Sequence, residues 1–125
     1  MLENKLEYPE TPIIELVKKE IIVYFDSKEI AKSSRPLKIL KKDLTPIYFI
    51  NLNNVHTKYL KKSDKHYTSP IIGISDFYDL ILENTKIENA AFIYSKPKDG
   101  YTILENYISF LPEKMDKIVL GDDII

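Results

Sequence analysis

The sequence predicts a single α/β domain over residues 1–125, with a four- or five-stranded mixed sheet and three or four helices packed on it. Three continuous runs of apolar, β-branched and aromatic residues are typical of buried strands: Ile21–Phe25, Pro46–Ile50 and Ala90–Tyr94. The segments between them carry helix-start signals and apolar residues at helical spacing. Strands separated by helices favour a sheet with at least one parallel pair.

Each helix is predicted from a cap or turn residue followed by an apolar stripe. The first opens at Thr11-Pro12, and the others are expected over Val55–Lys62, Phe77–Leu82 and Ile103–Leu111. Residues 28–36 are polar and predict a loop. Three weaker strands are expected at residues 37–44, 71–74 and 118–120.

The composition excludes several kinds of functional site and indicates where in the cell the protein is located. The chain has no cysteine, which excludes disulfides, zinc–thiolate sites and a cysteine nucleophile. Its first ten residues lack a basic start with an apolar run, and the longest apolar stretches are too short to cross a bilayer. We therefore expect a cytoplasmic protein that does not interact with a membrane.

Residues that could carry chemistry are sparse. The sequence has no phosphate-binding glycine loop, no glycine-flanked serine and no paired-histidine metal motif. His56 and His66 are the only histidines, and either could act as a general base, although an ordinary surface histidine is the simpler interpretation. Asp76 and Asp79 are explained as first-turn charges of a helix. We expect no enzymatic activity, no cofactor and no metal.

Charge is unevenly distributed along a chain whose net charge is −1. Residues 28–66 hold ten basic residues against three acidic ones, while both flanks are acidic. This pattern indicates either an interaction face or a solvated lysine-rich surface. Because all the basic residues but Arg35 are lysines, recognition of nucleic acid is disfavoured.

A candidate partner-binding site combines the lysine-rich segment with tyrosine, an amino acid enriched at interfaces. On the predicted helix, Lys58, Lys61, Lys62 and Lys65 are spaced to lie on one side. We expect these lysines, with Tyr59 and Tyr67 beside them, to contact the acidic surface of another protein. Nothing in the sequence fixes an oligomeric state.

The order of apolar segments from about Glu15 to Leu111 resembles the amino-terminal domain of the SseB family. Pro46-Ile47-Tyr48-Phe49 is similar to that family's second-strand motif, and Ala90–Tyr94 precedes Pro97 and the capped helix at Thr102. Ile50-Asn51 and Ser95-Lys96-Pro97 depart from the family pattern. The resemblance implies an α/β protein-binding module without a catalytic site.

Together these features predict a non-enzymatic protein-binding module, and one specific form is a bacterial immunity or antitoxin-type protein that occludes a toxin. Two alternatives remain open. One is a nucleic-acid-binding module that uses the Lys28–Lys65 segment. The other is a small enzyme whose site is built on His56 or His66.

Overall fold

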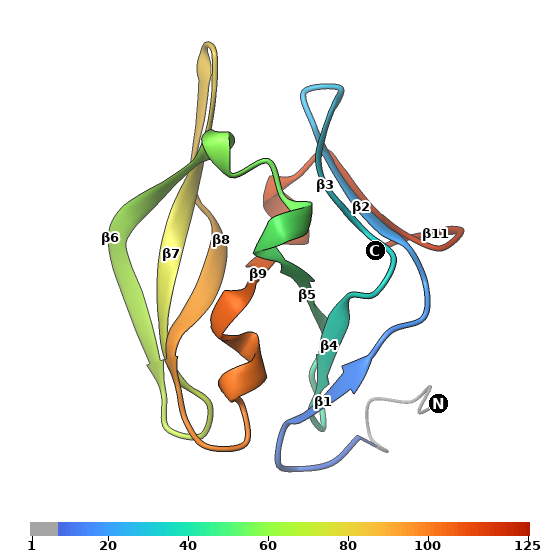
Figure 1. The fold of residues 1–125 in the computed structure, drawn as a ribbon, viewed down its shortest axis with the longest axis vertical. Coiled ribbons are helices and arrows are strands. Elements are labelled where there is room, and N and C mark those ends of the chain that lie inside the picture. The colour runs from blue at the N-terminus through green and yellow to red at the C-terminus, as the bar shows by residue number, and fades with distance from the viewer. Residues whose placement is uncertain (1–7) are drawn as a thin grey trace.

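The computed structural model describes residues 8–125, and across that range it contains eleven β-strands, four short 3-10 helices and no α-helix (Figure 1). The strands are β1 Ile13–Leu16, β2 Ile21–Phe25, β3 Lys28–Ser33, β4 Leu37–Leu40, β5 Ile47–Asn51, β6 Leu60–Ser69, β7 Gly73–Leu82, β8 Thr85–Pro97, β9 Tyr107–Phe110, β10 Lys117–Leu120 and β11 Asp123–Ile124. The 3-10 helices are η2 Leu52–Asn54, η3 Thr57–Tyr59, η4 Thr102–Asn106 and η5 Pro112–Lys114.

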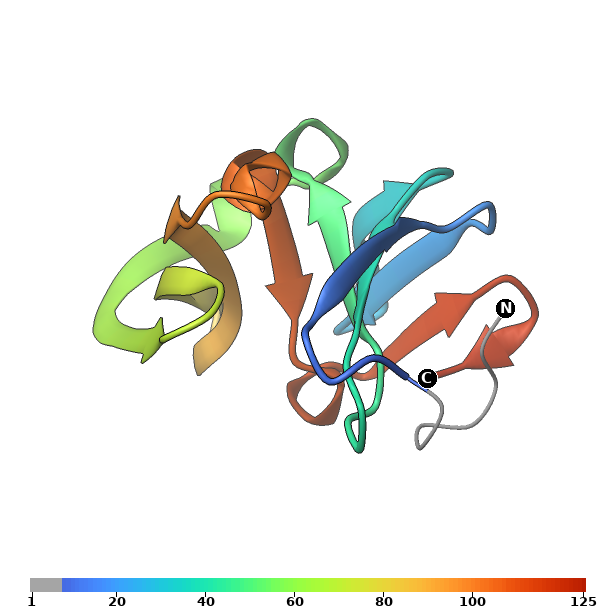
Figure 2. The same ribbon diagram turned by 90° about the horizontal axis from the view of Figure 1, so that it is seen from below.

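The strands form two sheets in which every pairing is antiparallel. The larger sheet has seven strands in the order β1-β4-β5-β9-β8-β7-β6, and the smaller has four in the order β11-β10-β2-β3. Figure 2 shows β6, β7 and β8 curling away from the smaller sheet at one end of the molecule. The β2–β3 turn places Asp26 and Ser27 at positive φ, as a two-residue hairpin requires.

The main core lies between the two sheets. From the smaller sheet, Val23 on β2 and Ile118 on β10 are buried in one apolar cluster with Ile50 on β5 and Ile108 on β9. Val23 and Ile108 have no exposed surface, and burying each side chain stabilises the fold by about 1.5–3 kcal/mol. The alternation of buried and partly exposed residues along β2 follows from the two-residue period of a strand.

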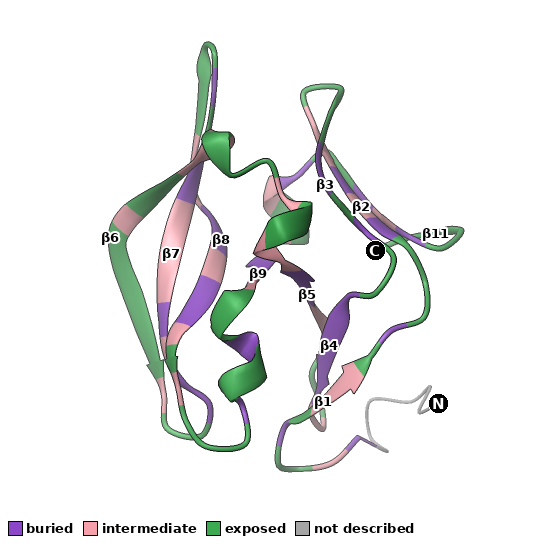
Figure 3. Cartoon of the chain, viewed as in Figure 1, coloured by how far each residue is buried: buried purple, intermediate pink, exposed green. Residues whose placement is uncertain are grey.

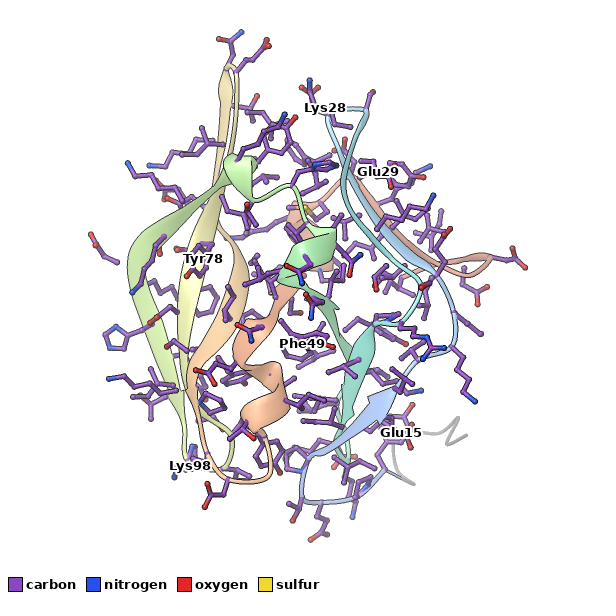
Figure 4. All side chains as sticks on the ribbon, in the orientation of Figure 1. Glu15, Lys28, Glu29, Phe49, Tyr78 and Lys98 are labelled. Carbon is purple, nitrogen blue, oxygen red and sulfur yellow. The ribbon has the colours of Figure 1, made fainter. Side chains whose placement is uncertain are left out.

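A second apolar cluster is built around aromatic rings on the opposite face of the larger sheet. Phe49 on β5 is completely buried, and Figure 4 shows it near the centre of the molecule. Its ring meets that of Phe92 on β8 edge to face, with centroids 5.8 Å apart. Tyr94 and Leu104 complete this cluster, and the Tyr101 hydroxyl donates a 2.6 Å hydrogen bond to the Pro12 carbonyl.

The predicted α/β class is wrong, because the described chain is nearly all β. The helix expected at Thr11-Pro12 is strand β1, and the helix expected over Phe77–Leu82 lies in β7. Residues 103–111 form the end of η4 followed by β9. At each place a cap-like residue precedes a segment whose apolar side chains fit a half-buried strand equally well.

Several predicted strands are confirmed, although they belong to different sheets. Ile21–Phe25 is β2 in the smaller sheet, residues 47–50 lie in β5, and Ala90–Tyr94 lies within β8. The polar segment expected to be a loop at residues 28–36 is mostly strand β3, which pairs with β2 through the tight hairpin. Across residues 8–125 no helix is long and apolar enough to cross a membrane.

The close approach of β7 and β8 depends on Gly73, which has a φ of 128°. A methyl group added at Gly73 would overlap the Lys96 carbonyl oxygen and lie 2.9 Å from the Pro97 Cα atom. We predict that Gly73→Ala lowers the free energy of unfolding by about 2 kcal/mol or more, through backbone strain and steric overlap. Denaturant unfolding measures the change.

The matched control for that substitution is Gly100→Ala. Gly100 also has a positive φ, of 90°, but an added methyl group meets no atom within 4 Å. We expect Gly100→Ala to cost only the backbone strain, of about 1 kcal/mol. If both substitutions lower the free energy of unfolding equally, the steric overlap of residue 73 with β8 does not contribute to the loss.

Candidate functional site

The residues predicted to bind a partner lie on the outer edge of the larger sheet. Lys58 and Tyr59 belong to η3, and β6 carries the other four, Lys61, Lys62, Lys65 and Tyr67. Within residues 8–125 no strand pairs with the outer edge of β6, and most of the ten residues of β6 are exposed (Figure 3). The structure therefore places the predicted residues on two consecutive elements, η3 and β6.

The expected helical arrangement of the four lysines is wrong. On a strand, consecutive side chains point to opposite faces, so Lys61 and Lys62 lie on opposite faces of the sheet and not along one side of a helix. The pairing of β6 with β7 is also interrupted between Lys62 and His66. Lys61, Lys62 and Lys65 all line one polar groove beside this bulge, and the Lys62 Nζ lies 3.4 Å from Asp76 Oδ2.

The polar groove has a volume of about 490 Å³ and lies where β6, β7 and β8 all depart from regular pairing. Its lining residues are Lys61, Lys62, Ser63, Asp64, Lys65, Asp79, Lys86, Glu88 and Asn89. Asn89 has a φ of 51°, a conformation that asparagine adopts more readily than most residues. Aligned irregularities in three neighbouring strands thus open a hollow at the sheet's edge.

A buried carboxylate organises the floor of the polar groove. Asp79 is 7% exposed, its Oδ1 accepts a 2.8 Å hydrogen bond from the Asn89 backbone N–H, and its Oδ2 lies 3.8 Å from the Lys86 Nζ. The Ser63 hydroxyl lies 2.6 Å from Asn89 Oδ1 and accepts a hydrogen bond from the Lys65 N–H. These contacts tie the three irregular segments together.

An aromatic row connects this edge to the core. The Lys65 Nζ lies 4.7 Å from the centroid of the Phe77 ring, which is 5.6 Å from the ring of Phe92. Tyr67 is opposite Ser75 on β7, which is in turn opposite Tyr94 on β8. Side chains directly opposite on neighbouring strands share a face, so Tyr67 lies on the same face as buried Tyr94.

The pKa of Tyr94 is affected by its burial and by Tyr67. Burial raises the pKa of Tyr94 above its ordinary value, and repulsion from the ionised Tyr67 phenolate raises this pKa further. Both causes favour the neutral phenol of Tyr94. At neutral pH the buried Tyr94 side chain is therefore a neutral phenol.

The fold partly offsets the charge segregation seen in the sequence. Four ion pairs join a lysine of the 28–66 segment to an acid outside it: Lys32–Glu20, Lys38–Glu15, Lys42–Glu10 and Lys62–Asp76, at 3.4–3.8 Å. Lys28 lies at the tip of the β2–β3 hairpin, away from β6 (Figure 4). Antiparallel pairing interleaves segments of opposite charge, so the basic segment does not form a single surface.

The two histidines are placed apart from the polar groove's lining. His56 precedes η3, where its N–H donates to the Ile30 carbonyl and its ring meets that of Tyr59 at 6.4 Å. His66 is exposed on β6, opposite Asp76. Within residues 8–125 no group of three or more histidine, aspartate or glutamate side chains is placed to hold a metal ion.

Sequence reasoning missed the residues of β7 and β8 that complete the groove. Asp79 was expected in the first turn of a helix, and Phe77 was expected on that helix's apolar stripe. Asn89 directly precedes the apolar run of β8 and resembles an ordinary turn residue. Ser75–Asp79 has the sequence Ser-Asp-Phe-Tyr-Asp, which shows no alternation of apolar and polar residues, so no local signal indicated a strand there.

We predict that Asp79→Asn lowers the free energy of unfolding by about 1–3 kcal/mol, because it weakens a buried hydrogen bond to a charged acceptor. Asp64→Asn is the matched control, since Asp64 lines the same groove but is exposed. It should change stability by less than about 0.5 kcal/mol. Urea unfolding of both variants checks this, and equal stabilities would contradict the structural role of Asp79.

A second prediction concerns alkaline pH. Because the pKa of Tyr94 is raised in the folded state, its stabilising contribution is complete below the unfolded value of about 10 and is lost as pH rises through the folded pKa. Unfolding free energy should therefore fall from about pH 9 to pH 11, and less steeply in Tyr94→Phe. Tyr67→Phe should move the pKa of Tyr94 toward its ordinary value. Identical slopes in wild type and Tyr94→Phe would refute this linkage.

Comparison with known proteins identifies a family but no activity. No curated protein matches the chain. A family model described as a domain of unknown function, DUF427, matches residues 13–121, from β1 to the end of β10. This match overturns the resemblance to the SseB family. The chain is therefore a member of the DUF427 family.

Proposed function

We propose that this domain is a non-enzymatic protein-binding module that accepts an extended, acidic segment of a partner protein along strand β6. The observation that carries the proposal is the position of Tyr67. Of the nine tyrosines in the chain it alone is exposed, at 59%, and it lies on the longest free strand edge in the described chain.

The two sheets have four edge strands of unequal length. The edges formed by β1, β3 and β11 have four, six and two residues, whereas β6 has ten. A long unpaired edge presents backbone N–H and C=O groups that another strand can pair with. Addition of a peptide strand to such an edge is a recurrent mode of recognition, in which the backbone supplies affinity and side chains supply specificity.

The side chains of β6 indicate the chemistry of the partner segment. The strand carries three lysines against Asp64 as its single acid, and Lys58 lies just before it. Acidic residues in the partner would complement these charges and increase the association rate. Tyr67 supplies a large ring and a hydroxyl at low conformational cost, as interface anchors do.

Protection of the edge is the competing explanation for the same residues. Lysines and a bulge on an edge strand are common devices that prevent aggregation. The bulge divides β6 into Leu60–Lys62 and His66–Ser69, and both parts retain regular pairing with β7. Protection alone gives no reason to expose a tyrosine on the second part, and this favours the binding interpretation.

Nucleic acid is not the partner that we propose. The ion pairs across the sheets interrupt the Lys28–Lys65 segment, and Arg35 is its only arginine. Arginine gives the bidentate contacts on which base recognition depends. In the specific immunity-type form of the proposal, the acidic segment belongs to a toxin whose active site the domain covers.

Selection of ten-residue peptides from a displayed random library tests the proposal on the intact chain. We expect enrichment of acidic sequences, and binding should perturb the backbone amide signals of His66–Ser69 more than those of edge strand β1. Enrichment of neutral sequences, or perturbation away from β6, would count against the proposal. A salt-sensitive complex with duplex DNA at physiological ionic strength would instead support the nucleic-acid alternative.

Association and dissociation rates measured with the selected peptide separate the role of the lysines from that of Tyr67. Lys61→Glu combined with Lys65→Glu should reduce the association rate at least about tenfold, because edge charges act mainly on encounter. Tyr67→Ala should speed dissociation at least about tenfold. Lys18→Glu with Lys28→Glu, at exposed positions outside β6, is the matched control. If the β6 charge reversal leaves the association rate unchanged, the lysines only solvate the edge.

A further inference from the structure

A separate hollow lies between the two sheets, away from β6. It has a volume of about 520 Å³ and is lined from β2 and β10 on one side and from β5 and β9 on the other. Thr45 and Pro46 before β5, and Leu111–Glu113 after β9, form part of its wall. This apolar pocket shares no lining residue with the polar groove.

The apolar pocket exists because β5 and β9 diverge. The two strands pair only at Ile50↔Ile108 and Asn51↔Tyr107. Before Ile50, β5 pairs with β4 alone, while Ser109 and Phe110 of β9 pair with β8 alone. The facing strand edges therefore separate, and the space between them is not closed by backbone hydrogen bonding.

Core residues form the inner wall of the apolar pocket. Ile21, Val23, Ile50 and Ile118 are all buried, yet each contributes to the lining. Protein interiors are normally packed with few voids larger than a water molecule. An apolar cavity of only about 150 Å³ binds benzene, and ligand pockets commonly measure about 300–1,000 Å³. This hollow is therefore large enough for a small organic molecule.

The few polar groups of the apolar pocket define what it can bind. Tyr48 lines it, and burial, with a smaller contribution from Tyr8, raises the pKa of its phenol. The phenol is thus neutral at physiological pH and can donate a hydrogen bond. Thr45, Ser109 and the exposed Glu113 are the other polar residues of the lining within residues 8–125, which contains no lysine, arginine or histidine. An anionic group would enter without a cationic partner and would be disfavoured.

We propose that the apolar pocket is a binding site for a neutral, largely apolar small molecule whose single hydrogen-bonding group meets Tyr48. This site does not depend on partner binding at β6. A flat apolar surface would suit a protein partner, but walls from four strands and buried residues in the lining suit a compact ligand that is itself largely buried.

The first test uses the intact wild-type protein and two probes of equal chain length, 1-octanol and octanoate. Titration is followed by isothermal calorimetry and by the methyl signals of ¹³C-labelled isoleucine. We expect saturable binding of 1-octanol at least about tenfold tighter than that of octanoate, with shifts at Ile50 and Ile118 and none at exposed Ile103. Absence of saturable 1-octanol binding, or equal affinity for octanoate, overturns the proposal.

Two substitutions then locate the site. Tyr48→Phe should weaken 1-octanol binding about threefold to tenfold, the effect of one hydrogen bond, while Tyr67→Phe leaves it unchanged. Leu111→Trp should fill the hollow and reduce binding more strongly than Ile103→Trp, a control at a position that is 54% exposed. If folded Tyr48→Phe binds 1-octanol as tightly as the wild type does, the ligand makes no hydrogen bond to Tyr48 and the proposal is wrong. Isoleucine shifts outside the lining would place the ligand elsewhere and refute the proposal.

Discussion

The apolar faces that the two sheets turn toward each other cannot remain in water without a large loss of hydrophobic stabilisation. Ile21 and Val23 of the smaller sheet cover Ile50 and Ile108 of the larger one, and all four are almost fully buried. Sequence-distant strands thereby become neighbours across the core. The divergence of β5 and β9 is tolerated because this shared core continues on either side of the gap.

Strands could be predicted where the chain is continuously apolar and β-branched. Ile21–Phe25 is such a segment, and it has no plausible helical face to separate from a polar one. Phe77–Leu82 is different, because Ser75 and Asp76 before it and Asp79 within it suit a helix start as well as a half-buried strand. This segment is a strand because β7 pairs with β6 and β8. Those pairings join it to residues outside the segment, so no local pattern reveals them.

The candidate site shows the same division between composition and geometry. The run of lysines with Tyr59 and Tyr67 beside it is visible in the sequence, whereas the exposure of Tyr67, and not of Tyr59, is a property of the fold. The arrangement of these residues could not be predicted either, because it depends on a bulge between Lys62 and His66 and on Asn89 two strands away. Ion pairing of Lys62 with Asp76 likewise exists only after the strands have paired.

The pairing of β10 with β2 has a consequence for how the chain acquires its fold. Val23 is opposite Ile118, so one of the central ladders of the smaller sheet joins residues near the two ends of the described chain. Contacts of such wide sequence separation form late and slow folding, because a long loop must close before they contribute. During synthesis, the β2–β3 hairpin emerges long before β10 and keeps its apolar side uncovered. Until the ribosome has released β10, this hairpin is a surface that chaperones would recognise.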